Sequence, residues 1–573
     1  MSNDIPRSRA RIESIERRLT RIFSLDIRDY FKKWIPLGIM MGLVGGLGAM
    51  AFEFLLELIW SSFYETVAVP WYLIVFIPAV GGVIMGFLVS YMAPEAEGPG
   101  QDNVVNALHH TGGKVRPIVA PVKLVASALT IGTGGSAGRE GPISQITAGL
   151  ANFVADRFKL SRSDLRILVI SGMAAGMSAV FKAPLGAAIF AIEIPYKNDL
   201  ESSAVVPAMV SSAVAYLVFV PFYGVEPLFS FPDVNIFLSA EVFPLTILTG
   251  FVLGLVGLGF IQLRNRMSRF FKELTLPLYF RAGLGGLMVG IIGLSIPGVL
   301  GLSEGIIQDL IDGAITSILV LLAILVGKIV ATSLTVGSGG SGGVFFPSLV
   351  IGGTVGGAIG VLSGLDITPI LVVVGMGSMM AGVTKTPIAS SIMLTEMVGG
   401  VSVLIPLMIS SIISYTVTGS RTIYESQITQ HSFTLDISML SKVRVGDVME
   451  GNVIIIQEDE NLAEIIAKVR DNPHYLYPAI DSNGKMVGMA PMDLIEKEFS
   501  SSPESSLRKV IQTHYDTIPS DKEALEAFDI MNSKQISRMI VVSPMDNKKI
   551  VGIITRRDLM DTLERLDERH HEF

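Results

Sequence analysis

The stretch T-I-G-T-G-G-S-A-G-R-E-G-P, from Thr130 to Pro142, lies in the middle of a strongly apolar sequence and contains five glycines. Glycine is unfavourable inside a helix and proline is favoured in a first helical turn, so the stretch predicts a break followed by a new helix. A helix N-terminus exposes free N–H groups that attract anions, and at membrane depth it must face protein or an aqueous pathway. Glu140 is one candidate anion. The stretch therefore predicts an anion-transport site where this carboxylate competes with the transported ion.

An internal repeat is the strongest feature of the sequence. The segment K-L-V-A-S-A-L-T-I-G-T-G-G-S-A-G-R-E-G-P (Lys123 to Pro142) aligns without a gap with K-I-V-A-T-S-L-T-V-G-S-G-G-S-G-G-V-F-F-P (Lys328 to Pro347), at an offset of 205 residues. A second pair of segments, at an offset of 203, places Glu193 over Glu396. The membrane part is therefore expected to consist of two halves of one fold.

The two halves, at about 35–225 and 240–430, are expected to have opposite orientations. Residues 1–33 carry nine basic and five acidic residues, which indicates a cytoplasmic N-terminus by the positive-inside rule. The tail has no translocation signal, so both termini are expected in the cytoplasm. Two inverted halves, each with an odd number of spans, satisfy this constraint and bring the two glycine-rich breaks together. Several apolar segments are shorter than the roughly 20 residues of a full span, which favours partial helices.

The two breaks differ most clearly at one position, where the first half has Glu140 and the second has Phe345. One half then supplies a carboxylate, and the other supplies the backbone N–H groups of Val344 and Phe345, which can hold a dehydrated anion. Two negative charges about 4 Å apart repel by about 4 kcal/mol at an effective dielectric constant of about 20, so an arriving anion would displace Glu140 or drive its protonation. We therefore expect Glu140 to gate the pathway and to link anions to protons. Two alternatives remain: the glycines serve only close helix packing, or Glu140 pairs permanently with Arg139.

The composition separates a membrane part from a soluble tail. Half of the 573 residues are hydrophobic and the mean hydropathy is +0.55, which is too apolar for a soluble protein. From Lys442 onward there are 17 basic and 24 acidic residues, an ordinary solvated balance. The chain has no Cys, which excludes disulfides, thiolate metal sites and cysteine nucleophiles. Apolar residues three or four apart from Ile12 to Ile22 predict an amphipathic helix over 1–34 on the membrane surface.

Three motifs resemble the CLC family of chloride channels and chloride/proton exchangers. They are G-R-E-G-P (Gly138 to Pro142), G-V-F-F-P (Gly343 to Pro347) and Tyr424 in R-T-I-Y-E-S after the last span. The resemblance covers about 30–430. It implies a multi-span α-helical membrane protein with the inverted-repeat CLC fold of tilted and partial helices, built as a homodimer in the cell membrane with one pore per subunit.

The resemblance also assigns roles to individual residues. Glu140 would be the external gating glutamate, Val344 and Phe345 would donate N–H groups to the central anion, and Tyr424 would donate its hydroxyl. The complete set of predicted anion-binding residues is Pro99, Gly100, Arg139, Glu140, Val344, Phe345 and Tyr424.

Two departures from the family pattern affect the expected function. The usual motif G-S-G-I-P is replaced by G-P-G-Q-D (Gly98 to Asp102), and Pro99 in the serine position offers neither a hydroxyl nor an N–H. In similar plant members proline there accompanies nitrate preference, so nitrate is an alternative substrate. Exchangers usually carry an inner proton-relaying glutamate, but alignment at F-K-A-P places Glu193 one residue too early and Ile194 in that position. Glu193 is kept as a proton-path candidate beside Glu140, with a structural role at its helix end as the alternative.

The tail resembles a pair of CBS domains, which often bind adenine nucleotides such as ATP. Its two halves end in the similar segments V-G-M-A-P-M-D-L (Val487 to Leu494) and V-G-I-I-T-R-R-D-L (Val551 to Leu559). Thr555 and Asp558 match the residues that contact phosphate and ribose in such pairs. The first copy has Pro491 in place of the hydroxyl, so at most one intact nucleotide site is expected, with a ligand-free dimer-stabilising domain as the alternative.

The expected domains are the N-terminal helix (1–34), the CLC transmembrane domain (35–430), a linker (431–442) and two CBS domains of an α/β cytoplasmic unit (443–500 and 506–570). The function expected is chloride transport gated by Glu140, with proton-coupled exchange favoured over a voltage- or pH-gated channel. The seven His residues form no metal-ligand spacing and no G-x-S-x-G or Walker loop is present, so neither an enzyme nor a metal site is expected. Chloride, protons, membrane lipid and a second copy are the expected partners, and nucleic acid is not.

Overall fold

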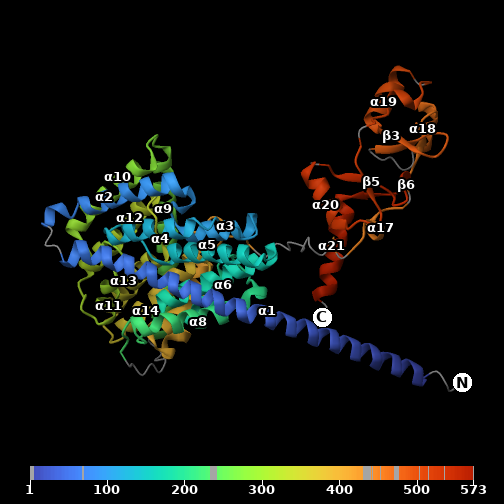
Figure 1. Ribbon diagram of the computed structural model, residues 1–573. Helices are drawn as coiled ribbons and strands as arrows, with labels where there is room; N and C mark the ends of the chain where they lie inside the picture. Colours follow the sequence, from blue (N-terminus) through green and yellow to red (C-terminus); the bar gives the residue numbers. More distant parts are fainter. Residues whose placement is uncertain are drawn as a thin grey trace. The chain divides into compact units, whose positions relative to one another are not determined.

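The computed structural model describes the backbone of residues 5–66, 70–232, 242–429, 440–441, 443–451, 453–469, 476–502, 504–513, 515–534 and 536–571, without side-chain detail for 5–29, 66, 71 and 564–571. These residues form two compact units, Met1–His431 and Ser432–Phe573 (Figure 1). Each unit is described by itself. Most of the predicted linker at 431–442 lies outside the described residues.

The first unit is helical, and its helices repeat in the same order in both halves. The first half contains α1 (Ile5–Ser61), α2 (Phe76–Met92), α3 (Gly100–His110), α4 (Val119–Gly132), α5 (Glu140–Phe158), α6 (Arg162–Phe181), α7 (Pro184–Glu193) and α8 (Val205–Tyr223). The second half contains α9 (Val242–Glu273), α10 (Leu278–Ser295), α11 (Glu304–Ile311), α12 (Ile318–Gly337), α13 (Phe345–Ser363), α14 (Thr368–Thr384), α15 (Pro387–Val398) and α16 (Leu404–Thr418). The helices α5 and α13 begin 205 residues apart and both have 19 residues, as the repeat predicts.

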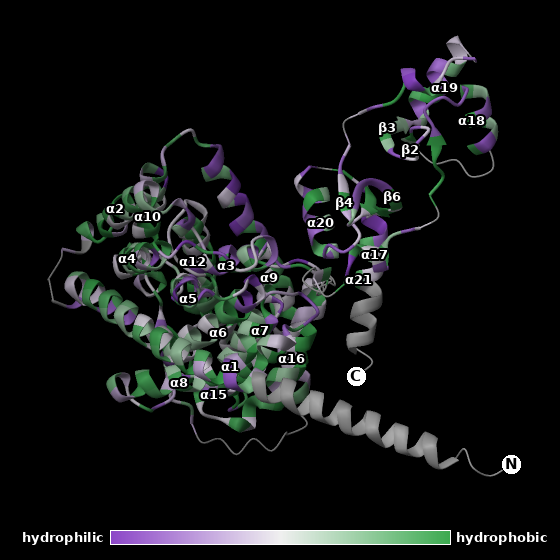
Figure 2. Ribbon diagram, turned by 45° about the vertical axis from the view of Figure 1, so that its right-hand side comes forward, coloured by the Kyte–Doolittle hydropathy of each residue, from purple (hydrophilic) through white to green (hydrophobic). Residues whose placement is uncertain are grey.

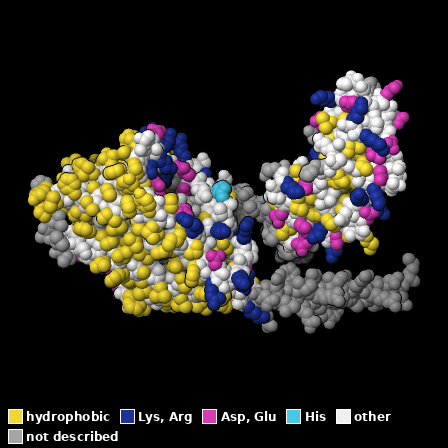
Figure 3. Space-filling model, turned by 45° about the horizontal axis from the view of Figure 1, so that its top comes forward, with side chains coloured by type: hydrophobic (Ala, Val, Ile, Leu, Met, Phe, Trp, Pro, Cys, Tyr) yellow, Lys and Arg dark blue, Asp and Glu magenta, His cyan; other side chains and the backbone are white. Residues whose placement is uncertain are grey.

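The helices of this unit have uneven lengths. Among the described residues, 8 helices are long and apolar enough to cross a membrane, and five apolar helices are shorter. Hydrophobic side chains cover the face of this unit seen in Figure 3, and charged side chains gather at its edge. The ribbon in Figure 2 shows hydrophobic residues along most of its helices. Large hydrophobic side chains such as Phe54, Phe87 and Leu217 are more than half exposed. Such a surface fits contact with lipid, and the uneven lengths fit helices that end part-way across.

The N-terminal helix differs from our expectation. We expected a surface helix over 1–34 followed by a separate membrane helix, but α1 continues without interruption to Ser61. The stretch from Tyr30 to Pro36, where we expected the boundary, contains no glycine, and Pro36 lies inside the helix without ending it. The apolar residues from Ile12 to Ile22 lie outside the part of the chain whose side chains are described.

The glycine-rich breaks have nearly identical backbones in the two halves. Gly134 and Gly339 have φ angles of +100° and +98°, which residues with a side chain rarely adopt. The next residue in each half closes the same turn, from Gly135 N to Thr130 O at 2.8 Å and from Gly340 N to Thr335 O at 2.9 Å. Each break is therefore a defined turn, and α5 or α13 begins a few residues after it.

The two halves also cap each other's helices. The Glu193 carboxylate accepts hydrogen bonds from Ile388 N (3.2 Å) and Ala389 N (2.7 Å), in the first turn of α15. The Glu396 carboxylate accepts in the same way from Leu185 N (3.1 Å) and Gly186 N (2.7 Å), in the first turn of α7. Each carboxylate thus satisfies N–H groups that its partner helix leaves unpaired.

The second unit repeats one small α/β motif. The first copy contains α17 (Val445–Val448), β1 (Ile456–Gln457), α18 (Leu462–Val469), β2 (Leu476–Ile480), β3 (Met486–Pro491) and α19 (Met492–Ser501). The second contains β4 (Thr517–Pro519), α20 (Ala524–Ser533), β5 (Arg538–Ser543), β6 (Asp546–Thr555) and α21 (Arg556–His571). In both sheets the short first strand is parallel to the second, and the second is antiparallel to the third.

Candidate functional site: an anion pathway between three helix ends

Three helices begin close to one another in the interior of the first unit. The strands before α5 and α13 form an antiparallel bridge, with N–O distances of 2.8 Å from Gly138 to Gly343 and 2.7 Å in the opposite direction. A Cβ atom placed on Gly141 would lie 3.1 Å from the Gly343 Cα and 3.4 Å from the Gly100 nitrogen, which belongs to the first residue of α3. The N-termini of α3, α5 and α13 therefore meet around Gly141. Their N–H groups and dipoles favour an anion here.

The carboxylate of Glu140 already occupies the beginning of α13. Glu140 is fully buried, and its Oε1 atom accepts a hydrogen bond of 2.6 Å from Phe345 N. Its Oε2 atom has no partner among the described residues. Side chains on Gly138 or Gly343 would collide with this carboxylate, so these two glycines leave the space that it fills. Val344, predicted to share the anion site, is the N-cap residue of α13.

Arg139 does not pair with Glu140. Its Nη1 donates to Glu53 Oε1 at 2.6 Å, and its Nη2 lies 2.7 Å from Glu304 Oε1. The guanidinium also lies over the rings of Phe181 (5.7 Å) and Phe346 (5.6 Å). The alternative of a permanent Arg139–Glu140 pair is therefore wrong in this conformation. The buried guanidinium is thus held by two other carboxylates, while Arg139 itself is the N-cap residue of α5. Its role in anion binding stays a prediction.

Pro99 and Gly100 lie at the start of α3, as N-cap and first helical residue. The residue that follows, Gln101, is fully buried, and its Oε1 atom accepts a hydrogen bond of 3.1 Å from the Tyr424 hydroxyl. Tyr424 is also fully buried, and its backbone N–H donates to Thr422 Oγ1 at 3.1 Å. The hydroxyl that we expected to face the anion is thus directed at a glutamine side chain.

Two buried lysines, which sequence reasoning missed, hold the loops before α3 and α11. Lys123 Nζ donates to Ala96 O (3.0 Å) and Gly98 O (2.6 Å), directly before Pro99. Its repeat partner Lys328 donates in the same way to the loop before α11. Both begin the repeated segments, so a lysine in a membrane segment was the available signal.

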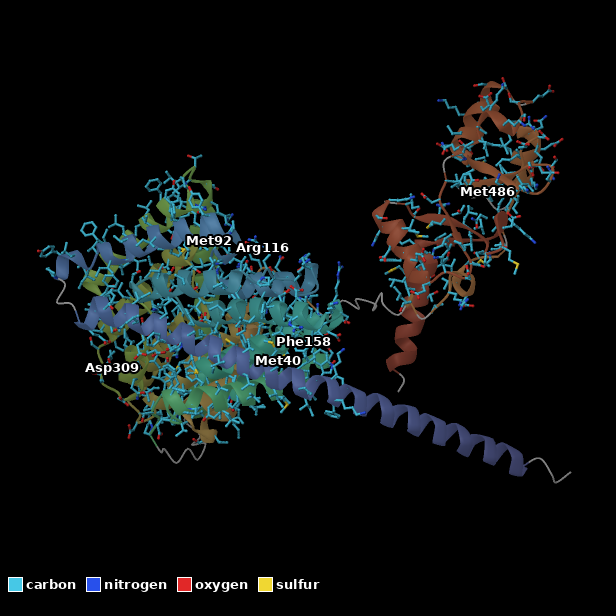
Figure 4. The ribbon with its side chains drawn as sticks, viewed as in Figure 1. Met40, Met92, Arg116, Phe158, Asp309 and Met486 are labelled. Atoms are coloured by element: carbon cyan, nitrogen blue, oxygen red, sulfur yellow. The ribbon has the colours of Figure 1, made fainter. Side chains whose placement is uncertain are left out.

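An ion pair at the surface supports the same loop. Arg116 donates to both carboxylate oxygens of Glu95, at 2.5 and 2.6 Å, and Figure 4 shows Arg116 at the edge of the unit. The Glu95 carbonyl in turn accepts from Gln145 Nε2 at 2.8 Å. The start of α3 is thus tied both to α5 and to the surface.

Comparison with known proteins identifies the family. The model of the voltage gated chloride channel family matches residues 81–419, more than half of the chain. The chain belongs to the CLC family. The CBS domain model matches residues 445–495 and 507–565, so this CLC protein carries a CBS pair after its membrane part. It is a multi-pass membrane protein of a family that transports anions across membranes.

Individual relatives agree with this assignment. The chain is 33% identical over 397 residues to an uncharacterized protein of Methanocaldococcus jannaschii, covering 69% of this chain and 95% of that one. It is 31% identical over 370 residues to the voltage-gated ClC-type chloride channel ClcB of Shigella flexneri, covering 62% and 87%. A solved CLC-type fluoride/proton antiporter superposes with a TM-score of 0.61 at 25% identity, covering 71% of this chain and 99% of that one.

The surroundings of Glu193 differ from those of Glu140. Glu193 is used as the cap of α15, and the next residue, Ile194, is fully buried. The carbonyl of Ile194 accepts from Gln427 Nε2 at 2.8 Å. The structure therefore brings together Glu140, Phe345 and Gly100, and it links Tyr424 to them through Gln101. Glu193 lies in a separate polar contact.

The CBS pair contains a cavity of about 360 Å³ between its two copies. Its lining residues come from both sheets, from the segment before β4 and from the segment between α20 and β5: Leu476, Met489, Gln512, Tyr515, Asp516, Ile536, Ser537, Arg538, Met539, Ile540 and Ile553. Thr555 and Asp558 are not among them. The backbone N–H and the hydroxyl of Thr555 both donate to Asp558 Oδ2 at 2.8 Å, where α21 begins. Thr555 does lie opposite Arg538 in the sheet, which places it one strand from the cavity.

Proposed function

We propose that this CLC protein exchanges chloride for protons, with Glu140 as the gate. The observation that supports the proposal is the hydrogen bond of 2.6 Å from Phe345 N to Glu140 Oε1. The carboxylate acts as an anion at the N-terminus of α13, in a fully buried site. A chloride ion needs the same N–H groups, so it can enter only when the carboxylate leaves.

The coupling follows from charge repulsion in this site. Two unit negative charges about 4 Å apart repel by about 4 kcal/mol at an effective dielectric constant of about 20. Protonation of Glu140 removes this repulsion and weakens its bond to Phe345 N, so proton binding and anion entry favour each other. The similarity to a fluoride/proton antiporter supports the same type of exchange.

A passive channel is the second candidate, because of the inner end of the unit. An apolar side chain at Ile194 cannot carry a proton, and the Glu193 carboxylate is already bound by two N–H groups. If protons cannot cross this end, Glu140 gates the pathway without exchange. Nitrate is the alternative anion, because Pro99 provides no donor at the start of α3.

Proteoliposomes with the purified full-length protein distinguish exchange from passive flow. An imposed chloride gradient is expected to drive proton movement against the proton gradient, with the membrane voltage clamped by potassium and valinomycin. If chloride moves without any proton movement at every voltage, the exchange proposal is wrong and the passive channel is the remaining candidate. Uptake of labelled chloride in competition with nitrate then ranks the two anions.

Assembly and orientation form part of the proposal. We propose a homodimer with both termini in the cytoplasm of the cell, as in the family. An apolar groove of about 220 Å³ on α15 and α16, lined among others by Ile388, Leu404, Met408 and Ile412, offers a surface for the second copy or for lipid. Mass measurement of the protein in lipid nanodiscs tests the dimer.

We also propose that the CBS cavity binds an adenine nucleotide such as ATP. The cavity combines apolar residues for a base with Asp516 and Arg538 for ribose and phosphate. Thr555 and Asp558 would contribute only if their mutual hydrogen bonds open. Calorimetric titration of the full-length protein with ATP tests this, and Arg538→Ala is expected to weaken binding.

A further inference from the structure

We propose that the side-chain amide of Gln101 donates a hydrogen bond to the transported anion and helps to select it. The inference rests on the proposed anion pathway and adds a residue to it. No family motif predicts a donor here, because the family's usual motif has an apolar residue at this position.

The first observation is an unused donor. Gln101 is fully buried, and its Nε2 group has no hydrogen-bond partner among the described residues. A buried N–H group without an acceptor is costly, and native proteins almost always satisfy it. An anion that enters the site would supply an acceptor for this donor.

The second observation is the orientation of the amide. The Tyr424 hydroxyl donates to Gln101 Oε1 at 3.1 Å, which leaves the two N–H donors of the amide free to face elsewhere. The two residues are 323 positions apart in the chain, and both are fully buried. Tyr424 thus acts on the anion indirectly, as a positioning residue for Gln101.

The third observation is the position of Gln101 at the meeting point of the three helix ends. It is the second residue of α3, and a Cβ atom on Gly141 would lie 3.5 Å from its backbone nitrogen. The backbone nitrogen of Gln101 therefore lies where these helix ends meet, and their N–H groups and dipoles favour an anion over a cation as the acceptor for its amide. Pro99 lacks an N–H and a hydroxyl, so Gln101 supplies the side-chain donor that this helix start otherwise lacks.

The chemistry of an amide predicts a preference. Its two N–H donors lie in a plane with a fixed spacing, which suits two oxygens of a planar oxyanion such as nitrate better than a single spherical halide. Removing the amide is therefore expected to weaken nitrate binding by about tenfold and chloride binding by about threefold.

The test uses the full-length protein and the anions themselves. Calorimetric titration with sodium chloride and sodium nitrate is carried out on Gln101→Leu, which removes the donor at similar size, and on Gln101→Met in case the branched side chain disturbs packing. Pro99→Ser in the Gln101→Leu background supplies a hydroxyl at the start of the same helix. We expect the double variant to bind chloride more tightly than Gln101→Leu alone and about as tightly as the unchanged protein.

Gln308→Ala is the matched control. Gln308 lies on α11, the helix of the second half that corresponds to α3, and aligns with Gln101 at an offset of 207 residues. Its amide bonds to the Ser230 backbone and to Asp312. Figure 4 shows its neighbour Asp309 at the edge of the unit. This variant is expected to keep both affinities.

The outcomes separate this inference from the proposed function. If the unchanged protein binds and transports no anion, the proposed function itself fails. If it does, and both Gln101 variants keep both affinities within twofold, the amide has no role toward the anion and the inference is wrong. If Tyr424→Phe alone reproduces the loss while the Gln101 variants do not, the hydroxyl is the donor and the inference is again wrong.

Discussion

At the scale of single residues, Glu140 determines how this pathway responds to protons. A Glu140→Gln variant can no longer ionise, so neither an arriving anion nor a change of pH alters its charge. We expect this variant to pass chloride while proton coupling and the pH dependence of the flux disappear. Chloride flux from proteoliposomes between pH 4 and pH 8, with proton uptake followed in the same vesicles, measures both effects. Unchanged pH dependence would show that another group is the gate.

Gly138 has no side chain, and the Glu140 carboxyl group occupies the space beside it. The three atoms nearest to a Cβ atom on Gly138 all belong to the Glu140 carboxyl group, and the Gly138 backbone is fixed by two hydrogen bonds to Gly343. Gly138→Ala is therefore expected to push the carboxylate out and to lower stability by about 1–3 kcal/mol. In the Gly138→Ala/Glu140→Ala double variant the loss is expected to shrink, because the colliding group is gone. Thermal unfolding of both variants in detergent measures this difference, and equal losses would refute the collision.

At the scale of helices, the two matching caps, Glu193 at the start of α15 and Glu396 at the start of α7, allow a structural role of Glu193 to be distinguished from a role in proton transport. Glu193 and Glu396 make matching contacts, so Glu193→Gln and Glu396→Gln are each expected to cost about 1–3 kcal/mol of stability. If Glu193 only caps α15, the two variants leave proton movement equally intact. Unfolding temperatures and proton flux of both variants are compared. Loss of proton flux in Glu193→Gln alone would place this residue in the proton path.

At the scale of the whole molecule, the two units have separate cores and should respond to separate changes. The Asp481 carboxylate accepts from Lys485 N (2.8 Å) and Asn483 N (2.9 Å) in the turn between β2 and β3, and these hydrogen bonds lower its pKa. A lowered pKa stabilises the fold above the unfolded value of about 3.9, and this stability is lost as the pH falls through the folded value.

Asp481→Ala is therefore expected to lower the unfolding temperature of the CBS unit at pH 7 and to leave that of the membrane unit unchanged. The difference from the unchanged protein should decrease in acid below about pH 4. Calorimetry of the full-length protein at both pH values measures this. A shift of both transitions would show that the two units unfold together.

The fold was largely predictable, because the repeat and the motifs lie within short stretches of sequence. The offset of 205 residues placed α5 over α13, and the comparisons confirm the CLC family and the CBS pair. Local motifs also placed Glu140 beside the helix with Phe345.

The remaining features depend on contacts between distant residues, which local sequence patterns do not reveal. Gln101 is hydrogen-bonded to Tyr424, which lies 323 positions later in the chain. Arg139 forms ion pairs with Glu53 and Glu304 and not with its neighbour Glu140. The continuity of α1 was missed for another reason: a change from charged to apolar composition resembles a boundary, although nothing there stops a helix.

The reciprocal caps have a consequence for how the chain is made. The partner of Glu193 is the start of α15, and the partner of the start of α7 is Glu396; both partners are synthesised about 200 residues later. Until then the first half carries one carboxylate and one helix start whose partners in the second half do not yet exist. These polar contacts therefore stay incomplete until the second half has been synthesised and has folded against the first. The polar groups of these two helix starts and carboxylates are thus satisfied only when both halves of the repeat pack against each other.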